Sequence, residues 1–176
     1  MTSLAIKNNR GFTLLEVMLY LVLFSLVVGG IIALSHSVLS QRVKNQVIAE
    51  VNYQAEAVNA AIIRAVHEAS SVSAPTPGNG AGSLTLAMPS SQINPTVFQA
   101  VFDSSTTRLQ ISEGSPAVKN FLTNSHVTIG NLNFTNAAVS GGKDSIKFQF
   151  DLSYKSSSQR SEYQFTKSFF GAADIK

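Results

Sequence analysis

The sequence predicts an α+β fold in which one long N-terminal helix packs on an antiparallel β-sheet. Two changes of pattern support this prediction. A nearly uninterrupted apolar run at residues 11–34 passes into apolar side chains at helical spacing, and beyond residue 82 the apolar period falls to 2. The 176 residues, 44% of them hydrophobic, allow one membrane helix and one modest globular domain.

The apolar run is long enough to cross a membrane, because a hydrocarbon core about 30 Å thick needs roughly 20 helical residues. Glu16 is the only formal charge between Arg10 and Arg42. An acidic side chain at bilayer depth costs roughly 2.5–3.5 kcal/mol. Glu16 is therefore a candidate functional residue that needs a partner, unless it only reaches back to the lipid headgroups from the start of the helix.

Residues 1–11 form a short polar leader with two cations, Lys7 and Arg10, and no acid. Under the positive-inside rule this end stays in the cytoplasm, and the chain beyond the apolar run is translocated. An alternative is a secretory signal peptide cut near Ala33-Leu34-Ser35. The apolar run is long for that reading, because the apolar region of a signal peptide usually has about 7–15 residues.

The segment Gly-Phe-Thr-Leu-Leu-Glu at residues 11–16 resembles the N-terminal motif of the type IV pilin family, which includes the pseudopilins of type II secretion systems. Four features coincide: a basic leader ending in Gly, a Phe after it, a Glu at the fifth position after the Gly, and a long apolar helix. In that family a prepilin peptidase cuts after the Gly, and the new N-terminus is usually methylated. The resemblance implies cleavage between Gly11 and Phe12 and methylation of Phe12.

The resemblance also assigns Glu16 to assembly. When subunits stack, Glu16 of one subunit can meet the Phe12 ammonium of its neighbour, which pairs two charges that would each be costly alone in an apolar environment. Small residues recur four apart along one helix face, where neighbouring helices could approach closely; chance accounts for this stripe about as well. They are Ser25, Gly29, Ala33 and Ser37.

The helix is expected to continue over residues 35–71 as an amphipathic segment. Its apolar stripe comprises Val43, Val47, Val51, Ala55, Val58, Ile62, Ala65 and Ala69. Arg64 and Glu68 are spaced for an i, i+4 ion pair. A segment rich in Pro and Gly at residues 71–82 ends the helix, and residues 72–176 form the globular β-domain.

Alternating apolar and polar residues predict short antiparallel strands in this domain. The segments are 84–88, 97–102, 109–111, 127–134 and 146–154. A final segment follows, with alternating residues Tyr163, Phe165, Lys167 and Phe169. The last two segments are expected to form a hairpin whose aromatic face packs against the helix stripe. The overall arrangement resembles the J-type minor pseudopilins and their W-type pilus counterparts, although many pilins have a proline inside the helix and the first proline here is Pro75.

The residue content does not support catalysis. There are no cysteines, the three histidines are scattered, and no serine lies in a nucleophile motif. No cofactor or metal is expected, although a calcium site among Asp103, Glu113, Asp144 and Asp151 stays open. The formal charge is +3, and removal of the leader's two cations leaves 11 basic against 10 acidic residues, or +1, so nucleic-acid binding is not indicated.

These observations predict a structural subunit, a minor pilin or pseudopilin, of a type IV pilus or a filament like that of type II secretion. The resemblance implies as partners other pilin subunits, the prepilin peptidase and an inner-membrane assembly platform, and the apolar run implies membrane lipid. The precursor would cross the inner membrane once, with its C-terminal domain outside the cytoplasm, before joining a periplasmic or cell-surface filament. The alternative is a membrane-anchored or secreted ligand-binding β-domain that uses residues 12–34 only as an anchor or signal.

Overall fold

The computed structural model describes residues 13–138 and 142–176. It contains one α-helix, α1, at Leu14–Glu68, and a short 3-10 helix at Ser161–Tyr163. The strands are β1 Ser71–Ala74, β2 Gly80–Ala81, β3 Ser83–Ala87, β4 Thr96–Asp103, β5 Thr106–Glu113, β6 Val118–Phe121, β7 Val127–Asn136, β8 Ser145–Tyr154 and β9 Thr166–Asp174. A long N-terminal helix with antiparallel sheets confirms the predicted α+β, pilin-like fold.

The described residues separate into two compact units, and the division lies between Arg42 and Val43. The first unit contains the N-terminal half of α1. Its apolar side chains are exposed, from Leu14 at 81% to Leu39 at 60%. The helix continues without interruption through Gly29 and Gly30.

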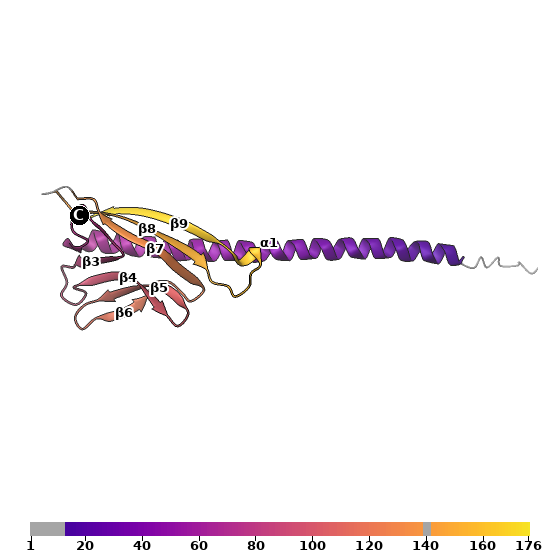
Figure 1. Cartoon of the computed structure of the whole chain (residues 1–176), viewed down its shortest axis with the longest axis horizontal. Coiled ribbons are helices and arrows are strands. Elements are labelled where there is room, and N and C mark those ends of the chain that lie inside the picture. The colour runs from indigo at the N-terminus through magenta and orange to yellow at the C-terminus, as the bar shows by residue number, and fades with distance from the viewer. Residues whose placement is uncertain (1–12, 139–141) are drawn as a thin grey trace, which may run out of the picture. The chain divides into compact units, whose positions relative to one another are not determined.

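In the second unit the strands form two antiparallel sheets. The five-stranded sheet has the order β1-β3-β4-β5-β6, and the four-stranded sheet has the order β2-β7-β8-β9. Figure 1 shows β7, β8 and β9 lying along the C-terminal part of α1. The predicted hairpin is confirmed, because β8 pairs with β9 from Ser145↔Asp174 to Ser153↔Thr166.

The core of this unit lies between the C-terminal half of α1 and the sheets. Its helix residues repeat every three or four positions, as the sequence predicts, and β8 shows strict alternation with Phe148 and Phe150 pointing inward. The two rings stack with centroids 6.4 Å apart. The buried helix residues are Val47, Val51, Gln54, Ala55, Val58, Ile62, Ala65 and Val66.

Three sequence predictions need correction. The segment at residues 71–82 is not only a breaker, because it contains β1, which pairs with β3, and β2, which pairs with β7. Strand β6 was not predicted, since all four of its residues are exposed and it has no apolar alternation. The last strand begins at Thr166 instead of near Tyr163, which lies in the 3-10 helix.

Candidate processing and assembly site

Thr13 begins the helix at the site that the motif marks. Its hydroxyl oxygen accepts a hydrogen bond from the backbone N–H of Glu16 at 3.3 Å, and its carbonyl accepts bonds from the N–H groups of Glu16 and Val17. A threonine side chain that bonds the N–H three residues later is half of a capping box. The helix start is therefore set by the motif itself.

The carboxylate of Glu16 lies in the first turn of α1 and is half-buried. The hydroxyl of Tyr20, one turn further along, donates a hydrogen bond to Oε1 of Glu16 at 3.4 Å. An acidic group in a first turn also interacts favourably with the positive end of the helix dipole. Both effects reduce the cost of placing this carboxylate in an apolar segment.

Sequence reasoning missed Thr13 and Tyr20 as neighbours of Glu16. The pattern Thr-x-x-Glu at residues 13–16 is a readable capping signal. The spacing of four between Glu16 and Tyr20 places both side chains on one face of a helix. Both signals are present in the sequence and both could have found these residues.

Gly11 and Phe12, the predicted cleavage and methylation site, lie outside the described residues. Cleavage and methylation there stay predictions, as does the assembly role of Glu16.

The small residues Ser25, Gly29, Ala33 and Ser37 are all exposed on α1. A Cβ added at Gly29 would meet no atom within 4 Å, so this position leaves open space beside the helix. The Ser25 hydroxyl bonds back to the carbonyl of Val22 at 2.9 Å, which satisfies it within its own helix. The use of this face in helix packing stays a prediction.

The N-terminal half of α1 is apolar enough to cross a membrane. Its most apolar stretch of 18 residues has a mean hydropathy of 2.7, and none of that stretch is buried. Exposed apolar side chains over this length are stable in hydrocarbon or against other apolar helices. The helix therefore fits an anchor for a membrane-bound precursor.

Three of the four acids considered for calcium have separate neighbours. Asp103 pairs with Arg108 at 2.9 Å, Asp144 accepts the Val72 N–H at 3.0 Å, and Asp151 accepts from Asn131 at 2.5 Å. Within residues 13–138 and 142–176, no group of three or more His, Cys, Asp or Glu side chains could hold a metal ion.

Comparison with known proteins agrees with the geometry at the N-terminus. The prokaryotic N-terminal methylation motif, as a family model, matches residues 6–32. No curated protein and no solved structure matches this chain.

The long apolar helix and the matched segment together fit an inner-membrane-anchored precursor. The matched segment is the N-terminal methylation signature of type IV pilins and pseudopilins, and it supports a pilin-like precursor. The motif implies interaction with a prepilin peptidase and with other pilins, and it points to a structural protein and not to an enzyme.

Proposed function

We propose that this chain is a minor pilin or pseudopilin, a structural subunit of a type IV pilus or of a filament like that of type II secretion. The observation that supports this most directly is the N-terminal half of α1. It is exposed and apolar on all sides, and Glu16 is its single charge between Leu14 and Gln41. A helix of this kind suits a lipid bilayer first and a bundle of like helices afterwards.

Processing would occur between Gly11 and Phe12 and would supply a cation for Glu16, which has no ion-pair partner among residues 13–138 and 142–176. A glycine gives a protease an unobstructed, flexible backbone at the membrane surface. The cut exposes an ammonium on Phe12, and a methylated secondary amine keeps that charge. In the precursor, Tyr20 is the hydrogen-bond partner of Glu16; in the filament, the Phe12 ammonium of a neighbouring subunit would join it.

In the domain organisation that we propose, residues 1–11 are a cytoplasmic leader and residues 12–34 are the membrane and filament-core helix. Residues 35–71 extend the helix, and residues 72–176 form the domain outside the cytoplasm. Assembly would use head-to-tail contacts between N-terminal helices, which produce open fibres instead of closed rings. Besides other subunits and the peptidase, the partners would be an inner-membrane assembly platform and membrane lipid.

The assignment as a minor subunit rests on the helix interior. Many major pilins have a proline there, whereas α1 has none and the first proline is Pro75. A low ratio of this chain to the main subunit in purified filaments would support the minor role. Filaments that consist of this chain alone would contradict it.

The experiment for the assembly role replaces Glu16 with Ala or Val in cells that make the filament. Both variants should insert and be cleaved, but their incorporation into sheared filaments should fall at least about tenfold, because the neighbour's ammonium would be left unpaired in an apolar bundle. Glu56→Ala is the matched control, since Glu56 is exposed on the same helix in the second unit. Normal incorporation of the Glu16 variants would refute the pairing.

A further inference from the structure

The outer face of the four-stranded sheet presents an ordered set of side chains that the core does not use. The registers of β7, β8 and β9 place them in three cross-strand rows. The rows are Thr135–Lys147–Ala172, Asn133–Gln149–Phe170 and Gly130–Asp151–Ser168, with Asn131 beside the third. We call this set the Phe170 face.

Phe170 lies in the middle row of this face, on the edge strand β9, with 72% of its surface exposed. Its neighbour Phe169 turns inward and stacks on Phe150 with centroids 5.6 Å apart. The inner side of the sheet is already filled at the next position, because a Cβ on Gly171 would lie 2.2 Å from the Phe148 ring. Phe170 is therefore not needed for packing, and a large exposed apolar side chain among polar ones is a candidate contact residue.

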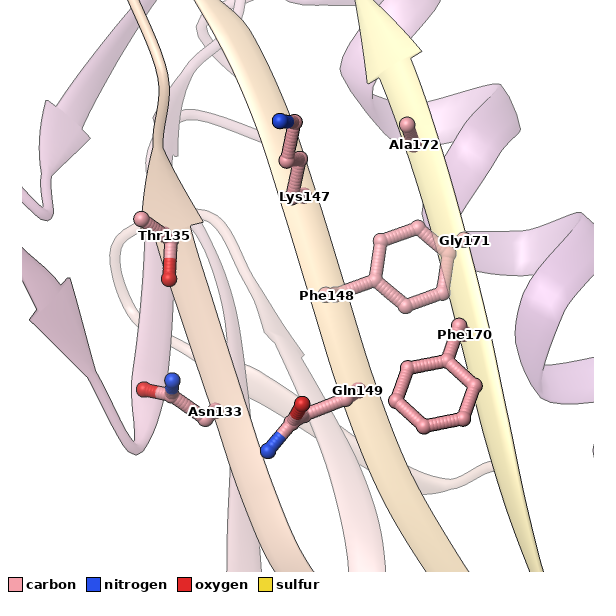
Figure 2. Close-up of a pocket in the computed structure, with 8 residues that line it drawn as sticks. All are labelled: Asn133, Thr135, Lys147, Phe148, Gln149, Phe170, Gly171 and Ala172. Atoms are coloured by element: carbon pink, nitrogen blue, oxygen red, sulfur yellow. The ribbon is translucent and has the colours of Figure 1, made fainter.

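Two hollows lie along the Phe170 face and share its central row. One, of about 490 Å³, extends toward Thr135, Lys147 and Ala172, and the other, of about 480 Å³, extends toward Asn131, Asp151 and Ser168. Figure 2 shows the first hollow, with the Phe170 ring on the β9 side and the Gln149 amide directed toward β7. Phe170 therefore lines both hollows from the β9 side.

The polar groups around the ring include two side-chain amides, from Asn133 and Gln149. Neither amide has a hydrogen-bond partner among the residues that the structure describes. A side-chain amide has an NH₂ group that donates two hydrogen bonds and an oxygen that accepts them. The central row therefore presents both donors and acceptors beside the exposed ring.

The third row is fixed in place by its own contacts. Hydrogen bonds from Ser168 and Asn131 lower the pKa of the Asp151 carboxyl, so it is ionised at neutral pH. Asn131 has a φ of 48° in the register shift between Gly130 and Asn133. A bulge redirects side chains, and a non-glycine residue at positive φ is strained unless a local contact holds it. Here the bulge aims the Asn131 amide at Asp151.

We propose that the Phe170 face is a binding surface for a neutral saccharide chain. Phe170 would stack on the apolar C–H face of a sugar ring, because the face of an aromatic ring is electron-rich. The amides of Asn133 and Gln149 and the carboxylate of Asp151 would bond the hydroxyl groups at the ring edge. A depression with one aromatic surface and a few well-placed polar groups is the usual composition of a small-ligand site.

The charge of the face favours a neutral ligand over an acidic one. Lys147 is its only cation and Asp151 its only anion, so the formal charge of the described set is zero. A nucleic acid could also stack a base on Phe170, but its binding depends on several cations along the backbone path. A second copy of the chain would be expected to cover an apolar patch instead of rows of amides and hydroxyls.

The test uses the full chain in phosphatidylcholine nanodiscs, which avoid sugar-based detergents. The probes are cellohexaose and chitohexaose, with heparin and single-stranded oligodeoxycytidine as acidic competitors, and binding is measured by calorimetry. At least one neutral hexasaccharide should bind, and Phe170→Ala should weaken that binding at least about fivefold because the stacking surface is lost. Gln149→Ala should weaken it by a smaller factor.

Phe102→Ala is the matched control, because Phe102 is 71% exposed on β4 of the other sheet. This variant should bind as the wild type does. The proposal is overturned if neither hexasaccharide binds, if Phe102→Ala loses as much affinity as Phe170→Ala, or if the acidic competitors bind in place of the sugars. Self-association of the wild type that Phe170→Ala abolishes would assign the face to a second copy and would also overturn it. The chain is tested unassembled, so the result does not depend on the proposed filament function.

Discussion

The two halves of α1 have the same backbone geometry but differ in what surrounds their apolar side chains. In the N-terminal half, large side chains such as Ile32 are exposed on every side. In the C-terminal half, one stripe that includes Ile62 is buried against the sheets, and charged side chains such as Glu56 lie on the exposed faces. The C-terminal half finds its packing partners within its own unit, whereas the N-terminal half needs lipid or other helices.

The largest expected effect tests this contrast with one substitution made in each half. Ile62→Ala should lower the free energy of unfolding of the β-domain by about 2–5 kcal/mol, since it leaves a cavity in a filled core. Ile32→Ala should change it by less than about 0.5 kcal/mol, because Ile32 is 63% exposed. Urea unfolding of the full chain in micelles, followed by circular dichroism, measures both. Equal effects would break the distinction between the halves.

A second pair of substitutions sharpens the contrast through glycines. Gly171→Ala would place a Cβ 2.2 Å from the Phe148 ring and 2.7 Å from Oδ1 of Asn59, and it should destabilise the domain by about 1–3 kcal/mol. Gly29→Ala meets nothing within 4 Å and should leave the domain unchanged. The same unfolding measurement applies. If the domain tolerates Gly171→Ala without loss of stability, the helix and the sheet pack less tightly at Gly171 than these distances indicate.

The smallest expected effect concerns the hydrogen bond between Tyr20 and Glu16 in the N-terminal half of α1. Tyr20→Phe removes the 3.4 Å hydrogen bond to Glu16 and should reduce filament incorporation by no more than about threefold, because one long hydrogen bond contributes about 0.5–1 kcal/mol. In a Glu16→Ala background the same change should have a smaller effect, since the hydrogen bond between the two residues is already lost. Losses that simply multiply would show that Tyr20 acts independently of Glu16.

The sequence was sufficient for the elements that have a strong apolar period. The C-terminal half of α1, at residues 47–66, and β8 bury one face against a common core, so the spacing of their apolar residues predicts the helix and the strand directly. Strand β6 has no apolar pattern of this kind, because its four residues are exposed. Its position depends on pairing with β5. Strands β1 and β2 are likewise short and lie among Pro and Gly residues.

The orientation of adjacent aromatic residues could not be read from the sequence in the same way. Phe169 and Phe170 are consecutive, and only the register of β9 on β8 shows which one faces the core. The Phe170 face depends on this register and on the bulge at Asn131, and neither has a local pattern. The N-terminal motif differs, since its residues are contiguous and their chemistry is local.

The mass of the mature N-terminal peptide is the most direct test of the central claim, which is that residues 11–16 form a processing and assembly site. The chain is isolated from the envelope of cells that contain the prepilin peptidase. The account predicts a peptide that begins at methylated Phe12, and the unprocessed form in cells that lack the peptidase. A mature chain that retains Met1, or one that begins near His36, would contradict it.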